Sequence, residues 1–278
     1  MDQIIIENLT KQYNGIYILD RVSHIFKAGR SVAFMGHNGC GKSTLLKLMA
    51  GLVKPTKGRV NCTGPVLFHY VPEKFMPVPL TARTYLKRMG ELDGLEKGQT
   101  GKKIELLGED FFLSELLDIP MKHLSKGTLQ KIGVIQALLR TPDVLLLDEP
   151  LSGQDTASQR VFIKKVNKMR EDGVTVLMAC HEQSLVDAVA EETYTIQDGA
   201  LTVYQPQYEK AYALILENTK SRAVPESMER YGNGYKLVVR EKEAQKAILG
   251  LLECGWNLKG MYDEKDNESC KTAAADIL

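Results

Sequence analysis

Residues 36–44 read Gly-His-Asn-Gly-Cys-Gly-Lys-Ser-Thr and match the spacing G-x-x-x-x-G-K-[ST] at every fixed position. Glycines at these positions allow successive backbone N–H groups to turn inward and surround phosphate oxygens. Lys42 is then placed to reach the β- and γ-phosphates, and the hydroxyl of Ser43 is placed to ligate Mg²⁺. The stretch predicts a nucleoside triphosphate site formed by Gly36, His37, Asn38, Gly39, Cys40, Gly41, Lys42, Ser43 and Thr44.

The residues on either side of this loop support the same interpretation. The largely apolar run 31–35 predicts a strand that ends at the loop, and residues 45–49 continue at helical spacing. A helix that opens at Ser43 directs its positive end at the bound anion. An ordinary glycine-rich turn is the alternative, but it does not account for a strand before the loop and a helix after it.

Composition places the chain among ordinary globular proteins. Its 278 residues are 44% hydrophobic and 26% charged, with a net charge of +1, so no general attraction to nucleic acid is expected. The five cysteines are scattered without metal-like spacing, which favours reduced thiols in the cytosol. The chain has no signal-peptide pattern and no apolar run near the ~20 residues that span a bilayer. We expect another chain to supply any membrane-spanning part.

A second motif ends in two carboxylates. Residues 144–147 are four apolar residues that suit a central parallel strand buried on both faces, and Asp148, Glu149 and Pro150 follow. Open α/β sheets bind ligands at the carboxyl ends of their strands. Asp148 is therefore predicted to bind Mg²⁺, and Glu149 to orient or deprotonate the attacking water. The alternative is a solvated turn after a strand, which the accompanying phosphate loop disfavours.

Further motifs follow in order along the chain. Residues 124–131 read Leu-Ser-Lys-Gly-Thr-Leu-Gln-Lys, and residues 151–155 read Leu-Ser-Gly-Gln-Asp after the acidic motif. Another apolar run, 174–179, leads to His181, and Tyr13 lies upstream of the phosphate loop. Over about residues 3–204 this series resembles the ATP-binding cassette (ABC) proteins. The segment after it, 205–278, resembles the C-terminal extensions of many bacterial export-type ABC subunits.

The resemblance implies a fold and a division into domains. The fold is α/β, a P-loop NTPase of ABC type with an antiparallel β-subdomain and a helical subdomain. Residues 1–204 would form the ABC ATP-binding domain, with the helical subdomain at about 74–135. Residues 4–6 and 22–26 are predicted strands of the β-subdomain.

The resemblance also implies roles in the composite site of a dimer. Two subunits would pack head to tail around two MgATP, so that the signature of one faces the γ-phosphate bound to the other. A helix that begins in this signature offers a hydroxyl, backbone N–H groups and a dipole end to that anion. Asp155, in a loop called the D-loop, would link the two sites across the dimer. The signature residues are Ser125, Lys126, Gly127 and Thr128.

The remaining implied roles belong to one subunit's own site. His181 would contact the γ-phosphate and hold the water and Glu149 in line. The catalytic set is then Lys42, Glu149 and His181. Tyr13 would stack on adenine, although Tyr17 is close by and either ring could pack as plain core.

Three positions and one cysteine depart from the commonest family residues. Glu73 replaces a strand-end glutamine and would ligate Mg²⁺ beside Ser43 and Asp148, with an extra negative charge that predicts slower hydrolysis or a raised Mg²⁺ requirement. In the signature, Lys126 replaces a glycine and Thr128 a glutamine. Cys40 is either a redox-sensitive thiol beside the phosphate site or a small residue that fits there.

Residues 74–123 change in character. Thr81 is a candidate cap for a helix that carries Tyr85 and Leu86, a polar stretch 94–103 follows, and a second helical run begins at Ile104. This pattern matches the helical subdomain that docks on a transmembrane partner in the resembled family. The apolar cluster Phe75, Met76, Pro77, Val78 and Leu80 is either a docking surface or local core.

Residues 205–278 read as a small α+β extension with a βαβαβ-like pattern. Strands are predicted at 212–216, 235–239 and 256–262, with a turn at 232–234. A short helix is predicted to start within 225–230, and an amphipathic helix to end at Gly255. The polar tail from 263 to 278 is predicted to be loose. The extension is interpreted as a brace for the dimer or a cap, with regulatory ligand binding as the alternative.

The resemblance favours an ATP-binding and ATP-hydrolysing subunit of an ABC transporter. ATP and Mg²⁺ are the expected cofactors, and the expected partners are a transmembrane permease subunit and a second ATP-binding subunit, identical or related. Export is the expected direction, at the cytoplasmic face of the membrane as a peripheral protein. The alternative is a soluble ABC ATPase without a transport role, acting on a cytosolic or nucleoprotein partner. Against it stand the single cassette, the near-neutral charge and the absence of a heptad run.

Overall fold

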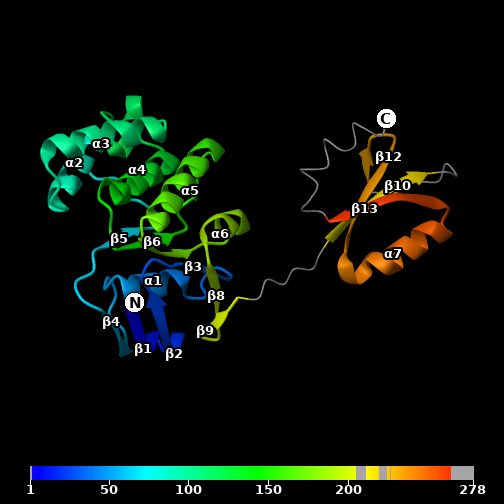
Figure 1. Cartoon of the computed structure of the whole chain (residues 1–278), viewed down its shortest axis with the longest axis horizontal. Helices are drawn as coiled ribbons and strands as arrows, with labels where there is room; N and C mark the ends of the chain where they lie inside the picture. The colour runs from blue at the N-terminus through cyan, green and yellow to red at the C-terminus, as the bar shows by residue number, and fades with distance from the viewer. Residues whose placement is uncertain (1, 205–210, 219–223, 226, 264–278) are drawn as a thin grey trace. The chain divides into compact units, whose positions relative to one another are not determined.

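A computed structural model describes residues 2–204, 211–218, 224–225 and 227–263 of the chain (Figure 1). The chain divides into two compact units, Met1–Gln205 and Pro206–Leu278. In the part of the chain that is described, no helix is both long and apolar enough to cross a membrane.

A six-stranded sheet in the described residues forms the centre of the first unit. Its strand order is β5-β6-β7-β3-β8-β9, parallel throughout except for β9, which runs antiparallel to β8. All residues of β3, β6 and β7 are buried, as expected for parallel strands covered on both faces. The strands are β3 (Ser31–Met35), β5 (Phe68–Val71), β6 (Val144–Asp148), β7 (Thr175–Ala179), β8 (Glu192–Gln197) and β9 (Ala200–Val203).

Two apolar cores cover the two faces of this sheet. The α1 core contains Val144 and Leu146 together with helix α1 (Lys42–Met49). The α4–α5 core contains Leu145 and Leu147 together with helices α4 (Lys126–Leu139) and α5 (Thr156–Glu171), and also the short helix α6 (Gln183–Val189). Consecutive residues of β6 therefore pack into opposite cores, because strand side chains alternate between faces.

A three-stranded antiparallel sheet, among the described residues, packs against the α1 core. Its order is β2-β1-β4, with β1 (Asp2–Tyr13), β2 (Ile16–Lys27) and β4 (Lys57–Cys62). The strands predicted at 4–6 and 22–26 are confirmed as parts of β1 and β2. In Figure 1 this sheet lies at one end of the first unit and helices α2–α4 lie at the other.

The helical part follows β5 in sequence. It contains α2 (Ala82–Leu92), α3 (Lys97–Asp110) and α4, with short 3-10 turns at Ser114–Leu116 and Met121–His123. Thr81 is confirmed as the cap of α2, because its side chain accepts a hydrogen bond from the backbone N–H of Thr84. The second helical run, predicted to begin at Ile104, begins earlier, at Lys97 within the polar stretch 94–103. Helix α3 begins there because Thr100, Ile104 and Leu107 share one buried face.

The apolar cluster at 75–80 does not form one surface. Phe75 packs edge to face on Tyr85, with ring centroids 5.7 Å apart, and lies against the α4–α5 core together with Val78. Met76 is 74% exposed. The interpretation as local core applies to Phe75 and Val78, whereas Met76 and Pro77 are exposed.

The described residues of the second unit form a four-stranded antiparallel sheet with order β11-β12-β10-β13 and one helix, α7 (Glu241–Glu253). The strands are β10 (Ala211–Asn218), β11 (Glu229–Tyr231), β12 (Gly234–Arg240) and β13 (Trp256–Asp263). Leu214, Leu216 and Trp256 form its core, with Ile248 and Leu251 of α7 packed against it. The strands predicted at 212–216, 235–239 and 256–262 are confirmed.

Two details of this unit differ from the expectation. The helix start predicted within 225–230 is wrong, because Met228 closes a turn on Pro225 and Glu229 and Arg230 belong to β11. Tyr231 pairs with Gly234 across a two-residue turn with Gly232 at φ +55°, and this hairpin ties the segment to β12. The described order is therefore β-β-β-α-β. The tail predicted to be loose lies outside the described residues after Asp263, which ends β13.

Candidate functional site

The parallel strands bring distant motifs to one edge of the sheet. Strands β3, β5, β6 and β7 all point their carboxyl ends the same way, since each pair of neighbours is parallel. The phosphate loop follows β3, Glu73 follows β5, Asp148 ends β6, and His181 follows β7. This is the edge at which open α/β sheets bind ligands.

The phosphate loop has the backbone conformation that its glycines predict. Gly36, Gly39 and Gly41 have φ values of +139°, +86° and +114°. At Gly41 a Cβ atom would also lie 2.9 Å from Cγ2 of Ile18, so both conformation and space require glycine there. Helix α1 begins at Lys42, one residue before the predicted Ser43, and Gly41 is its N-cap.

Lys42 is folded over this loop. Its Nζ donates hydrogen bonds to the backbone carbonyls of Gly36 at 2.7 Å and His37 at 3.3 Å, and the residue is only 6% exposed. The loop itself is closed by a bond from the N–H of Cys40 to the carbonyl of His37, at 3.3 Å. A buried ammonium group held at the N-terminus of a helix provides a positive site for a phosphate.

Two oxygen-bearing side chains that the sequence assigns to Mg²⁺ are in contact. The hydroxyl of Ser43 donates to Oδ1 of Asp148 at 2.7 Å, and Asp148 is 1% exposed. The hydroxyl of Tyr70, on β5, donates to the other carboxylate oxygen, Oδ2, at 2.8 Å. A hydroxyl and a carboxylate next to a phosphate loop are the hard oxygen ligands that Mg²⁺ prefers, so these residues fit that ion.

Glu73 lies beyond the end of β5 and is exposed. Its negative charge contributes to the raised pKa of Tyr70, after the larger effects of burial and of Asp148. The carboxylate is therefore close enough to affect this site electrostatically. The hydrogen bonds described for Asp148 come from Ser43 and Tyr70.

Glu149 and His181 form a direct pair. Nδ1 of His181 lies 2.7 Å from Oε2 of Glu149, and the backbone N–H of Glu149 donates to the carbonyl of Ala179 at 2.8 Å. Burial raises the pKa of Glu149, and the neighbouring His181 opposes this shift. Glu149 also has a left-handed backbone with φ +47°, an uncommon conformation for a residue other than glycine.

A third acidic side chain stands beside this pair. Ligand atoms of Glu149, His181 and Glu182 all lie within 4.8 Å of one another. The negative charge of Glu182 raises the pKa of Glu149, and the positive charge of Lys42 lowers it. Lys42 therefore acts electrostatically on the pair formed by Glu149 and His181. The four groups form one electrostatically coupled cluster.

The two candidate adenine-stacking rings are both exposed. Tyr13 is 46% exposed and Tyr17 is 56% exposed, so neither is core. Nζ of Lys11 lies 4.5 Å from the centroid of the Tyr13 ring and also donates to the carbonyl of Lys54 at 3.0 Å. One face of the Tyr13 ring is thus covered by an anchored cation.

The signature residues lie at the start of α4. Ser125 is the N-cap, and its Oγ accepts from the N–H of Thr128 at 3.1 Å and contacts the Thr128 hydroxyl at 2.9 Å. Ser125 and Lys126 are both exposed. Nζ of Lys126 lies 3.5 Å from the hydroxyl of Ser152. A Cβ on Gly127 would come within 2.2 Å of the carbonyl oxygen of Gly153, so the D-loop packs tightly against the signature helix.

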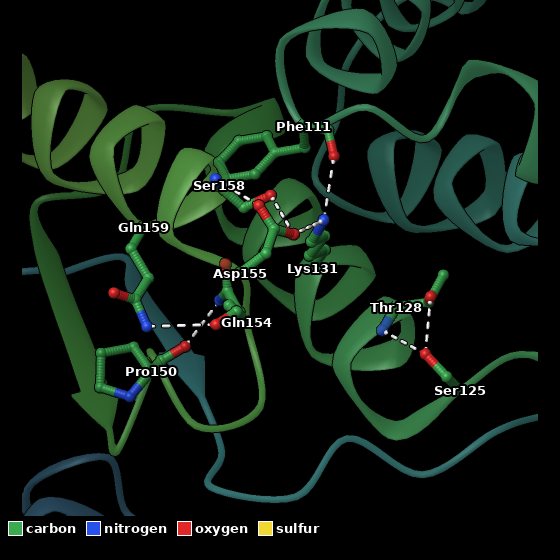
Figure 2. Close-up of polar contacts among 9 residues, drawn as sticks. All are labelled: Phe111, Ser125, Thr128, Lys131, Pro150, Gln154, Asp155, Ser158 and Gln159. Atoms are coloured by element: carbon green, nitrogen blue, oxygen red, sulfur yellow. Dashed lines mark hydrogen bonds and ion pairs between the residues drawn. The ribbon is translucent and has the colours of Figure 1, made fainter.

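The D-loop is tied to the signature helix by an ion pair (Figure 2). Nζ of Lys131 on α4 lies 2.6 Å from Oδ2 of Asp155, and Asp155 also caps α5 by accepting from the N–H of Ser158 at 2.9 Å. The bonds from Lys131 and Ser158 lower the pKa of Asp155. The carboxylate predicted to link two subunits is therefore occupied within its own chain.

The candidate residues fall into two groups. Lys42, Ser43, Asp148, Glu149 and His181 gather at the carboxyl edge of the sheet. The described polar side-chain contacts of Ser125, Lys126 and Thr128 are instead with one another and with Ser152. The signature is thus presented at the start of α4, apart from the bonded network of the phosphate loop.

Three residues of these groups have no role in the sequence-based prediction. They are Tyr70, which holds Asp148, Lys131, which holds Asp155, and Glu182, which lies beside Glu149. Lys131 is the last residue of the stretch 124–131, and Glu182 directly follows His181. Their positions in the sequence could therefore have identified them as candidate site residues. The contact of Tyr70 spans 78 residues and depends on the pairing of β5 with β6.

The family model described as ABC transporter matches residues 19–152. The chain is 31% identical to the zinc import ATP-binding protein ZnuC of Halorhodospira halophila, over 74% of this chain and 82% of that protein. It is 32% identical to the O-antigen export system ATP-binding protein RfbB of Klebsiella pneumoniae, over 66% and 74%. A solved structure titled "Structure of ATP binding subunit of ABC transporter" superposes with a TM-score of 0.67 at 25% identity, over 72% and 88%.

These relatives include one protein named for import and one named for export, so membership of the family carries no direction of transport. The predicted fold class is confirmed, because the superposed structure is an ATP-binding subunit and the motifs occupy the same kind of α/β unit. With this fold, these motifs and these relatives, the chain belongs to the ABC transporter family as an ATP-binding protein.

Proposed function

We propose that this chain hydrolyses ATP in the presence of Mg²⁺ and that Glu149 is the general base. The observation that carries the proposal is the contact between Glu149 and His181, 2.7 Å apart, in the same electrostatic cluster as Lys42. A carboxylate that is mostly buried and partnered by an imidazole is suited to accept a proton from water.

ATP binding would exchange contacts that the loop already makes. The N–H groups at the start of α1 and the ammonium of Lys42 would bind the phosphates, replacing the carbonyls of Gly36 and His37 as partners of Nζ. Tyr13 would stack on adenine with the ring face that Lys11 leaves free.

Ser43 and Asp148 would hold Mg²⁺, with Glu73 as a further oxygen donor. The ion, when bound, neutralises negative charge on the phosphates. The chain's own part is to keep the two oxygen donors together, which the 2.7 Å bond between Ser43 and Asp148 does. The exposed Glu73 adds negative charge on the same side.

In hydrolysis, Glu149 would take the proton of the attacking water while His181 orients the Glu149 carboxylate. His181 is 63% exposed in its side chain, so its outer nitrogen can turn toward a γ-phosphate. The left-handed backbone of Glu149 occurs where its carboxylate contacts His181, and the charge of Lys42 also acts on this carboxylate.

We further propose that two ATP-binding subunits, identical or related, close around two nucleotides. This is supported by the exposed hydroxyl and helix N-terminus of the signature, which are free of the chain's own phosphate loop in the described contacts. Asp155 would act at that interface through the loop that it anchors, because its carboxylate is already paired with Lys131.

The closing and opening of this pair would drive a transmembrane permease subunit at the cytoplasmic face of the membrane. We propose export as the direction of transport. The basis is the second, α+β unit, which follows the ATP-binding unit and resembles the C-terminal extensions of export-type subunits. Vesicles reconstituted with the co-purified permease, nucleotide sites outward, would accumulate the cargo in their lumen. Loss of preloaded cargo from the lumen would instead mean import.

Substitution Glu149→Gln tests the hydrolysis. We expect phosphate release to fall by at least about 100-fold, because a general base contributes 10²–10⁴-fold, while ATP binding is retained. Size-exclusion chromatography with MgATP should then show a dimer. A matched control is Glu171→Gln, at the end of α5. Undiminished phosphate release in Glu149→Gln would contradict the role of Glu149, and strictly monomeric elution would contradict the dimer.

A further inference from the structure

Tyr70 is placed against the acidic motif by the pairing of two strands. Strands β5 and β6 are parallel, and Tyr70 pairs with Leu146. Because side chains alternate along a strand, Asp148 lies on the same face as Leu146, two residues further on. The phenol of Tyr70 spans that distance and donates to Oδ2 of Asp148 at 2.8 Å. The contact follows from strand register and the length of a tyrosine side chain.

Two hydroxyl groups hold one buried carboxylate. Ser43 donates to Oδ1 and Tyr70 to Oδ2, and Asp148 is 1% exposed. The terminal torsion of an aspartate is broad, so its own backbone does not set the plane of the carboxylate. Two donors on opposite oxygens do set it. A carboxylate accepts about four hydrogen bonds or ligand contacts, so lone pairs are left for a cation.

The two donors differ in their relation to that cation. Ser43 belongs to the phosphate loop and would itself turn its oxygen to the ion. Tyr70 donates to the other oxygen of Asp148 from the edge strand β5 and lies outside the phosphate loop.

We propose that Tyr70 is a positioning residue for the magnesium site: its hydroxyl holds the plane of the Asp148 carboxylate so that a free lone pair faces the cation. The proposal rests on the proposed function, because it assigns Asp148 to Mg²⁺. Hydrogen bonds that orient metal ligands commonly account for 10- to 100-fold in metal affinity or activity. Tyr70 would therefore determine the cation requirement and leave the nucleotide contacts unchanged.

Tyr70→Phe removes only the hydroxyl. The measurement is the Mg²⁺ concentration that gives half-maximal tight binding of a fluorescent, non-hydrolysable ATP analogue, together with the affinity for the same analogue in EDTA. We expect the half-maximal Mg²⁺ concentration to rise about tenfold and the affinity in EDTA to stay within about twofold. An unchanged Mg²⁺ requirement would overturn the proposal. An equal loss of affinity for the analogue with and without Mg²⁺ would also overturn it, because the hydroxyl of Tyr70 would then support the fold and not the cation site.

Tyr194→Phe is the matched control. Tyr194 also donates its hydroxyl to a carboxylate, Oε2 of Glu192 at 2.9 Å, on strand β8 of the same sheet. The described ring and hydroxyl contacts of Tyr194 are with His24 and Glu192 and not with Asp148, so loss of the hydroxyl should leave the Mg²⁺ requirement unchanged. An equal tenfold shift in this control would mean that any lost tyrosine hydroxyl disturbs the sheet, and the proposal would fail.

A double substitution separates this inference from the proposed function. If Tyr70 acts through Asp148, then Tyr70→Phe adds no further shift in an Asp148→Asn background, and an added tenfold shift overturns the inference. This comparison also serves if Tyr70→Phe alone folds poorly, because both members carry Asp148→Asn. A wild-type chain whose binding of the analogue is independent of Mg²⁺ would overturn the proposed function as well.

Discussion

At the scale of single residues, Glu149 combines an uncommon backbone with a shifted proton affinity. Its φ of +47° and its bond to the carbonyl of Ala179 direct a side chain at 9% exposure toward His181. Burial raises its pKa, while His181 and Lys42 oppose that shift. A general base works only when deprotonated, so in the proposed mechanism the strength of this opposition would set the acid limb of the pH–rate profile.

We predict that His181→Ala moves this acid limb to higher pH. Without the imidazole, the influences that lower the pKa of Glu149 are weakened, and the carboxyl group takes up its proton at a higher pH. The ATPase rate should also fall at its optimum, by about 10²-fold or more, because orientation of the base is lost. The measurement is phosphate release from pH 5 to 9 at saturating MgATP. An acid limb that stays in place or moves to lower pH would contradict the coupling.

The residues of this site divide by how local their signals are. The phosphate loop and the pair Asp148 and Glu149 lie in short motifs whose spacing carries the chemistry, so they could be predicted. The bond from Tyr70 to Asp148 joins residues 78 apart and exists only because Tyr70 pairs with Leu146. No local sequence pattern predicts the register of β5 against β6, so the contact could be identified only from the folded sheet.

At the scale of elements, helices α4 and α5 are joined at the D-loop. Lys131 of α4 is buried, and its ammonium pairs with Asp155, which at the same time caps α5. Sequence signals located α4 and the Thr81 cap, but they missed the first residues of α3. The reason is physical, because glycines such as Gly98 and Gly101 weaken a helix in isolation while burial of Ile104 and Leu107 stabilises it in the fold.

We predict a graded effect at Asp155. Asp155→Asn keeps a capping side chain but loses the charge that pairs with Lys131, whereas Asp155→Ala loses both. Loss of a cap costs about 1 kcal/mol, or about 2–4 °C in melting temperature for a unit of this size, so Asp155→Ala should be the less stable variant. The measurement is thermal unfolding followed by circular dichroism. Equal melting temperatures for Asp155→Ala and wild type would contradict the capping role.

The pH dependence of this stability has a definite sign. The folded-state pKa of Asp155 is lowered, so its contribution is present above the unfolded value of 3.8 and is lost as the pH falls below it. The difference in melting temperature between wild type and Asp155→Asn should therefore stay constant from pH 7 to about 4 and shrink as the pH falls below 3.8. A difference that grows toward acid pH would exclude this ion pair as its source.

At the scale of the whole molecule, the two units have separate cores. The α1 core and the α4–α5 core are formed by residues of the first unit, and the core around Leu214 and Trp256 belongs to the second. Every candidate site residue lies in Met1–Gln205. Strands β10, β12 and β13 of the second unit could be predicted from their apolar residues and the turn signal at 232–234. Strand β11 could not, because its three residues form a strand through the tight turn to β12.

We predict that the fragment 1–205 folds and binds nucleotide by itself. Its affinity for a fluorescent ATP analogue should lie within about threefold of the full chain, because two of the cores and every candidate site residue belong to Met1–Gln205. The comparison is a binding titration of both proteins with Mg²⁺ present, with a Lys42→Ala fragment as the non-binding control. An unfolded fragment, or one that no longer binds, would show that residues 206–278 are needed for the first unit.

The helical segment that contains α2, α3 and α4 leaves the sheet after β5 and returns to it at β6. These two strands are parallel neighbours, so the departing link starts at the nucleotide edge while the returning link, ahead of Val144, joins at the opposite edge. Of these two links, only the departing one, through Pro72 and Glu73, lies at the edge of the sheet where the nucleotide site is proposed. A displacement of the helices would therefore be transmitted along the covalent chain to the nucleotide edge only through the link after β5. That link contains Glu73, three residues after Tyr70, whose hydroxyl donates to Asp148.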